Sequence, residues 1–173
     1  MNLVRPTLIL AMLAMTALGG CGKSETATDV APIEITQGTS CTLDGMLLAD
    51  YPGPKAQIHY AGQAEPEFFC DTVEMFNVYL NPEQVRPVRG LFVQDMGKAD
   101  WDQPQDHWID AKSALYVHGS KRHGSMGPTI ASFALEADAA KFAAEYGGKV
   151  YRFADVTPDM VVLDGGALHD SNM

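Results

Sequence analysis

Sulfur donors in two separate stretches of this chain could bind a soft metal ion. The segment Cys41-Thr42-Leu43-Asp44-Gly45-Met46 carries a thiol and a thioether on either side of Asp44-Gly45, a dipeptide typical of tight turns. Such a turn would make the sulfur of Met46 face that of Cys41. Met126 lies in the loop at residues 123–128 between glycines and a proline, where it has no helix or strand face to fill.

A thiolate with one or two thioethers is a ligand set that selects Cu(I), whereas Zn(II) would recruit more thiolate or imidazole. One thiolate neutralises one Cu(I), so a partly buried site of this kind carries no net charge. Three or fewer soft ligands also leave room for a recipient's ligand to attack the metal. The competing interpretation is that these methionines simply pack in the core, as most methionines do.

The remaining cysteines and histidines invite simpler interpretations. Cys70 follows Phe68-Phe69 and resembles a small buried hydrophobic residue. His123, three residues before Met126, could complete a copper site or bind Cu(II), but it could equally be a solvated loop histidine. Packing, surface or strand positions account for the other residues of these types: Met75, Met96, Met160, His59, His107, His118 and His169.

The N-terminus predicts export and lipid attachment. Arg5 precedes an apolar run from Leu8 to Leu18, which is shorter than the roughly 20 residues of a transmembrane helix and typical of a signal peptide. The run ends in Leu18-Gly19-Gly20-Cys21, which resembles a bacterial lipobox. We therefore expect cleavage of residues 1–20 and lipidation of Cys21. Gly22 in place of Asp after that cysteine favours the outer membrane.

Charge and composition limit the partners. The chain has a formal net charge of -10, and removing residues 1–20 takes away Arg5 and no acidic residue. This acidity argues against binding nucleic acid or anionic lipid, so membrane attachment would depend on the acyl chains. Residues 21–38 are predicted to be the lipidated cysteine and a flexible tether, residues 39–163 the folded domain, and residues 164–173 a loose tail.

The elements that must position the sulfur atoms form an α+β pattern. Strand-like segments are predicted at 56–60, 66–70, 88–93, 113–118, 129–135 and 150–153. Helices are predicted from Asp71 or Thr72 to about Leu80, and from Glu136 to Tyr146. The same order occurs twice, so we expect two β-β-α-β modules, about 39–98 and 107–163, that pack as one small domain.

Four stretches resemble one protein family. They are Cys41 to Met46, Gly53-Pro54-Lys55-Ala56-Gln57-Ile58, Phe69-Cys70-Asp71-Thr72-Val73-Glu74-Met75 and Gly124-Ser125-Met126-Gly127. Together with the lipobox they look like NosL, the nitrous oxide reductase accessory lipoprotein family. The resemblance implies a fold similar to a domain of organomercurial lyase. It also implies a periplasm-facing chaperone that binds one Cu(I) through Cys41, Met126 and Met46.

The family resemblance implies partners as well. The copper would serve assembly of the copper centres of nitrous oxide reductase, together with a membrane ABC transporter complex, and the protein could be a monomer or a copper-linked homodimer. We expect no catalytic activity. The alternatives are a structural or partner-binding lipoprotein with a Cys41–Cys70 disulfide and no metal, and an enzyme like organomercurial lyase, which would need both thiols and a nearby carboxylate.

Overall fold

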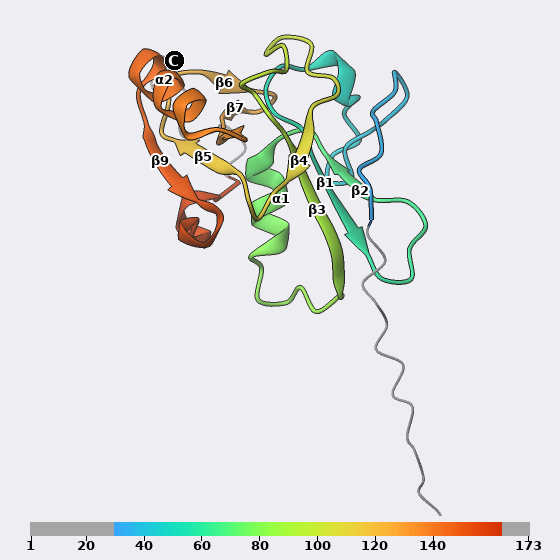
Figure 1. The fold of residues 1–173 in the computed structure, drawn as a ribbon. Helices are drawn as coiled ribbons and strands as arrows, with labels where there is room; N and C mark the ends of the chain where they lie inside the picture. The colour runs from blue at the N-terminus through green and yellow to red at the C-terminus, as the bar shows by residue number, and fades with distance from the viewer. Residues whose placement is uncertain (1–29, 164–173) are drawn as a thin grey trace, which may run out of the picture.

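The computed structural model describes residues 30–163 and has an α+β fold with antiparallel sheets (Figure 1). The predicted signal peptide, Cys21 and the tail at residues 164–173 lie outside this range. None of the helices in residues 30–163 is both long and apolar enough to cross a membrane.

The larger sheet has the strand order β2-β1-β3-β4. Its strands are β1 (Ala56–Tyr60), β2 (Glu67–Phe69), β3 (Val88–Gln94) and β4 (Trp108–Asp110). All residues of β1 are buried, because β1 pairs with β2 on one side and β3 on the other. This sheet is therefore the rigid support from which the loops at its ends project.

The smaller sheet has the order β8-β5-β9 and is covered by α2 (Glu136–Tyr146). Its strands are β5 (Leu115–His118), β8 (Ala131–Phe133) and β9 (Lys149–Arg152). Aromatic and small side chains of α2 pack against this sheet with Trp101. The helix ends at Gly147, whose φ of 79° favours glycine.

Helix α1 (Thr72–Tyr79) lies between the two sheets and joins their cores. Asp71 is its N-cap and accepts a hydrogen bond from the backbone N–H of Val73. Phe76 contacts the larger sheet's core and packs edge-on against Tyr116 of β5, with ring centroids 4.9 Å apart. The N-terminus of α1 is thus fixed next to the end of β2.

A short hairpin inserted between β5 and β8 consists of β6 (His123–Gly124) and β7 (Gly127–Pro128). Ser125 and Met126 form its tip. Three 3-10 helices complete the described elements: η1 (Leu48–Asp50), η2 (Phe153–Asp155) and η3 (Pro158–Met160).

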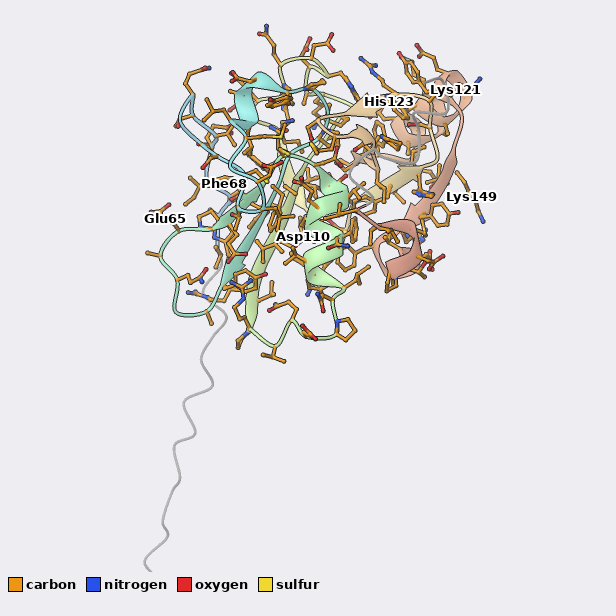
Figure 2. All side chains as sticks on the ribbon, turned by 180° about the vertical axis from the view of Figure 1, so that it is seen from behind. Glu65, Phe68, Asp110, Lys121, His123 and Lys149 are labelled. Carbon is orange, nitrogen blue, oxygen red and sulfur yellow. The ribbon has the colours of Figure 1, made fainter. Side chains whose placement is uncertain are left out.

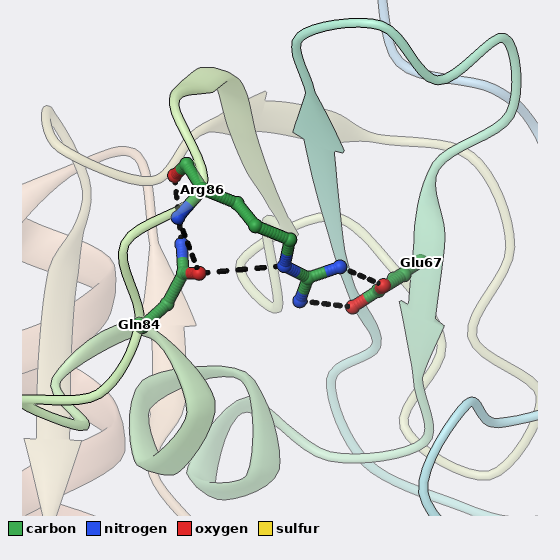
Figure 3. Close-up of polar contacts among 3 residues, drawn as sticks. All are labelled: Glu67, Gln84 and Arg86. Atoms are coloured by element: carbon green, nitrogen blue, oxygen red, sulfur yellow. Dashed lines mark hydrogen bonds and ion pairs between the residues drawn. The ribbon is translucent and has the colours of Figure 1, made fainter.

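At the far edge of the larger sheet, Arg86 ties a loop to β2 (Figure 3). Its guanidinium donates to the carboxylate of Glu67, and its Nε donates to the side-chain oxygen of Gln84 at 3.4 Å. The same guanidinium lies 3.6 Å from the centre of the Tyr60 ring. These contacts stabilise the edge of the sheet.

The predicted helices and strands are confirmed in position, and Asp71 is the cap of α1. Strand β4 was not predicted; its residues pair with β3. The predicted tether is too long, because its last part is held on the domain. Ile33 exchanges two hydrogen bonds of 2.9 Å with the side chain of Gln57, and Ile35 is buried. Isolated isoleucines among polar residues gave no periodic signal.

Candidate metal centre

Cys41 begins a tight loop at one end of the larger sheet. Its backbone N–H donates to the carbonyl of Met46 at 2.8 Å, and the N–H of Gly45 donates back to the carbonyl of Cys41 at 2.9 Å. Asp44 closes the turn by accepting the N–H of Met46, and Gly45 adopts a φ of 78°. The predicted turn is therefore present, and Cys41 and Met46 are backbone partners across it.

Cys70 approaches Cys41 because the loop is attached to β2. The N–H of Thr42 donates to the carbonyl of Phe68 at 2.8 Å, two residues before Cys70. Both cysteines are buried and both are free thiols. The Cys41–Cys70 disulfide considered from the sequence is absent from this structure.

The carboxylate of Glu74 lies between the two thiols. Its Oε2 is 3.3 Å from Sγ of Cys41 and 3.3 Å from Sγ of Cys70, and it also accepts the backbone N–H of Cys70 at 3.1 Å. Glu74 is in the first turn of α1, where the helix dipole favours negative charge. Ligand atoms of Cys41, Cys70, Glu74 and Asp44 all lie within 4.8 Å of one another.

This crowding distributes the protons unevenly. The pKa of Cys41 is lowered from 9.0 to about 6, chiefly because the Cys70 thiol donates a hydrogen bond to its sulfur. The pKa of Cys70 is raised by that same hydrogen bond and by burial. Burial, followed by the negative charge at Cys41, raises the pKa of Glu74 to about 7. Cys41 is therefore the thiolate of the pair at neutral pH.

Two further buried groups set the charge around the thiols. Lys55 is fully buried and its Nζ donates to the carbonyls of Pro52 and Cys70 at 2.9 and 3.1 Å. Burial lowers its pKa to about 8, so it is still mainly protonated at pH 7. Burial raises the pKa of Asp71 to about 7, and its Oδ2 has no hydrogen-bond partner among the described residues.

The β6–β7 hairpin closes over the thiols. Ser125 donates from its hydroxyl to the carbonyl of Cys70 at 2.8 Å and lies 3.3 Å from its sulfur. Gly124 permits this approach, because a Cβ at that position would lie 2.2 Å from Oδ2 of Asp71. Gly53 contacts the same glycine from the other side; its own Cβ would lie 2.7 Å from Cα of Gly124.

A cavity of about 310 Å³ opens beside the thiol cluster. It connects Glu74 and Asp44 with Met126, which is 46% exposed. The other lining residues come from the Cys41 loop, the start of α1, the end of β5 and the residues after it, the hairpin and the segment after β9: Leu43, Asp71, Val73, His118, Gly119, Ser120, Pro128, Thr129, Met160, Val162 and Leu163. The wall thus combines carboxylates with thioethers and one imidazole.

The structure brings some predicted residues to this cavity and leaves others apart. Met126 lines the cavity, whereas Met46 is half-buried and is not among its lining residues. His123 is exposed on the hairpin (Figure 2), and its carbonyl accepts the indole N–H of Trp101. Met75 packs in the core as expected, but Met160, interpreted as packing, also lines the cavity. His118, assigned to a strand, does so too.

Residue types and spacing did not identify Cys70, Glu74, Asp44 or Lys55 as metal ligands or neighbours of the metal. One signal was available for Glu74: it follows the cap Asp71 by three residues, the spacing at which a glutamate reaches back to an N–H before the helix. Lys55 gave no comparable signal, because its burial results from the tertiary structure.

Comparisons with known proteins match most of the chain to one family. The NosL family model matches residues 32–161. Copper-binding lipoprotein NosL of Stutzerimonas stutzeri is 38% identical over 169 residues, which cover 94% of this chain and 87% of that protein. The protein of the same name from Achromobacter cycloclastes is 39% identical over 158 residues, which cover 89% of this chain and 81% of that protein.

A solved structure agrees with the fold. The crystal structure of the copper chaperone NosL from Shewanella denitrificans superposes with a TM-score of 0.71 at 39% identity and covers 76% of this chain and 98% of that chain. The family model spans most of the chain, and relatives above 30% identity cover nearly all of it. This chain therefore belongs to the NosL family.

Proposed function

We propose that this protein binds Cu(I) at Cys41, with Met126 and Met46 as thioether ligands, and delivers the ion as a metallochaperone. The observation that carries the proposal is the position of Cys41. Its lowered pKa supplies a thiolate at neutral pH, and its cluster borders a cavity that Met126 also lines. Soft sulfur donors of this kind prefer Cu(I) to the harder divalent ions.

The charges around the site fit a cation as cargo. Asp44, Asp71 and Glu74 line the cavity beside the thiols, so the local potential favours a positive ion over an anionic ligand. Met126 is exposed at the hairpin tip, where a recipient's ligand can reach a metal bound there. Exchange of ligands at this opening would pass copper on without unfolding the protein.

The family resemblance supports a proposal for the recipient and the location. Relatives of this chain are named copper-binding lipoproteins and a copper chaperone. We propose that copper passes to the assembly of nitrous oxide reductase, together with a membrane ABC transporter complex. Lipidated Cys21 would hold the domain at the outer membrane, facing the periplasm, as a monomer or a copper-linked homodimer. The lipobox supports this location.

We further propose that the domain consists of two related β-β-α-β modules, about 39–98 and 107–163, similar to a domain of organomercurial lyase. The order of elements supports this: β1, β2, α1 and β3 are followed by β5, β8, α2 and β9. In the described structure, β4 lies within the second range but pairs with β3, so the second range contributes one strand to the first sheet.

A second candidate function is protonolysis of a carbon–mercury bond. The observation that favours it is the carboxylate of Glu74 within hydrogen-bond distance of both thiols. In such a step the Cys41 thiolate displaces the anion of the mercury salt, and Cys70 passes its proton to Glu74 and binds mercury. The carbon takes that proton from Glu74 as the carbon–mercury bond breaks. Release of benzene from a phenylmercury salt by the reduced protein would support this function. Its absence under conditions where Cu(I) binds would exclude it. The copper chaperone remains the first candidate because the relatives are named for copper.

The chaperone function can be tested in a denitrifying strain that lacks its own copy of this protein. Complementation with the wild type should restore the copper content and activity of nitrous oxide reductase. Complementation with Cys41→Ser should leave the reductase copper-deficient, although the variant should be present at the same level. Normal copper content with Cys41→Ser would refute the proposed role of Cys41 in delivery.

A further inference from the structure

Cys70 has surroundings that a packing cysteine would not need. Its sulfur lies 3.3 and 3.4 Å from the two oxygens of Glu74 and 3.3 Å from the hydroxyl of Ser125. A buried thiol that only fills space is normally surrounded by apolar atoms. Here three polar atoms from α1 and the hairpin surround one sulfur that has no exposed surface.

The spacing of the two thiols fits a single metal ion. The sulfurs of Cys41 and Cys70 lie within 4.8 Å of each other without a disulfide. Thiolates bind first-row metals at about 2.3 Å, so an ion between two sulfurs in a nearly linear arrangement separates them by about 4.6 Å. The two sulfurs are therefore close enough to share one ion.

The charge of such a site is also compensated. Two thiolates and one Cu(I) leave one net negative charge, which would be costly in a buried place without a partner. Lys55 supplies a buried ammonium group whose Nζ donates to the carbonyl of Cys70 itself. A site with one thiolate would be neutral with Cu(I), and the buried cation would then face only the carboxylates of Asp71 and Glu74.

We infer that Cys70 is a second thiolate ligand, so that Cu(I) is held primarily between Cys41 and Cys70. This inference rests on the proposed copper function and changes its ligand set. From the sequence, Cys70 was considered as a buried residue, a disulfide partner of Cys41 or a lyase thiol, but not as a copper ligand. Met126, across the cavity, then serves as the ligand that receives the ion on its way out rather than as an equal member of the resting site.

The sharpest test removes the thioethers and keeps both thiols. In the double variant Met46→Leu/Met126→Leu, X-ray absorption of the Cu(I) protein should still show two sulfur ligands at short thiolate distances. If Cu(I) were instead held by Cys41 and the two methionines, this variant would show only one sulfur ligand. A single sulfur ligand, or a loss of Cu(I) binding, would overturn the inference. Both substitutions affect side chains that are exposed or half-buried, so the fold should persist.

Single cysteine variants separate this inference from the chaperone function. Cys70→Ser and Cys70→Ala should each lower Cu(I) affinity by roughly tenfold or more in competition with a chelator, and circular dichroism should verify that each is folded. If both folded variants bind like the wild type while Cys41→Ser does not, Cys70 is no ligand and the chaperone function stands. If Cys41→Ser also binds like the wild type, the proposed function fails with it.

Discussion

Oε2 of Glu74 lies 3.3 Å from the sulfur of Cys41 and 3.3 Å from the sulfur of Cys70. Three ionisable groups in such a small buried space cannot all carry negative charge at neutral pH. The three groups therefore share their protons. Cys41 is the preferred thiolate, and the pKa of the Glu74 carboxyl is raised to about 7. Displacement of the remaining protons by a cation makes the cluster suited to metal binding.

The first prediction concerns the origin of the Cys41 thiolate. Cys70→Ala should raise the pKa of Cys41 above its value of about 6, because the largest cause of the lowering is the hydrogen bond from the Cys70 thiol. Cys70→Ser is the matched control, since a hydroxyl can still donate, and should change the pKa less. The measurement is the rate of Cys41 alkylation against pH, followed by mass spectrometry. An unchanged midpoint in Cys70→Ala would show that another group stabilises the thiolate.

The second prediction concerns stability against pH. Asp71 has a pKa of about 7 in the folded state and 3.8 as its ordinary value, so between these pH values the folded state binds more protons than the unfolded state. Stability from this residue should therefore fall as pH rises from about 4 to 7, by up to about 1.4 kcal/mol per pH unit.

Asp71→Asn keeps a good helix cap and removes this titration. Chemical denaturation of apoprotein at several pH values measures this. As pH rises, the free energy of unfolding should decrease less for Asp71→Asn than for the wild type. Glu74 contributes a fall of the same sign in both proteins, so the comparison isolates Asp71. If the free energy of unfolding depended on pH in the same way in both proteins, the raised pKa of Asp71 would be contradicted.

The third prediction tests how the hairpin is positioned. Gly124→Ala should destabilise the protein by about 1–3 kcal/mol, because its Cβ would lie 2.2 Å from Oδ2 of Asp71. Displacement of the hairpin should also weaken Cu(I) binding. Gly38→Ala is the control, since a Cβ there meets nothing within 4 Å. Thermal unfolding measures the stability and chelator competition measures the Cu(I) affinity. If both variants had the same stability and affinity, the hairpin would be able to move without cost.

The fourth prediction concerns the buried cation. Lys55→Met should cost about 1–3 kcal/mol of stability, because the carbonyls of Pro52 and Cys70 lose their donor. It should also lower the affinity for Cu(I), since the negative charge of the cluster would be less compensated. Lys112→Met, at an exposed position, should change neither quantity. Denaturation and metal competition on both variants test this, and unaltered copper affinity in a folded Lys55→Met would exclude the electrostatic role.

Much of the fold could be predicted because local signals agreed with the final structure. Helix α2 was found from the spacing of Ala139, Phe142 and Tyr146 and from the glycine that ends it. Strand β4 was missed because three residues give no clear alternation, and its pairing with β3 is a long-range event. The docking of Ile35 was missed for the same reason, since its partners are distant in the sequence.

Less of the candidate site could be predicted. Cys41 was selected because a thiol in a turn beside a thioether has a recognisable chemistry. The approach of Cys70 depends on the hydrogen bond between Thr42 and Phe68, which residue types alone do not indicate. Glu74 appeared to be an ordinary helix residue, and only its contacts with both sulfurs show its place in the cluster.

The most direct test of the central claim is a Cu(I) titration of reduced protein against a competing chelator, comparing the wild type with Cys41→Ser, Met46→Leu and Met126→Leu. We expect tight binding of one Cu(I) by the wild type, the largest loss of affinity for Cys41→Ser and a smaller loss of affinity for each methionine variant. Equal affinity in all four proteins would contradict the proposed copper site.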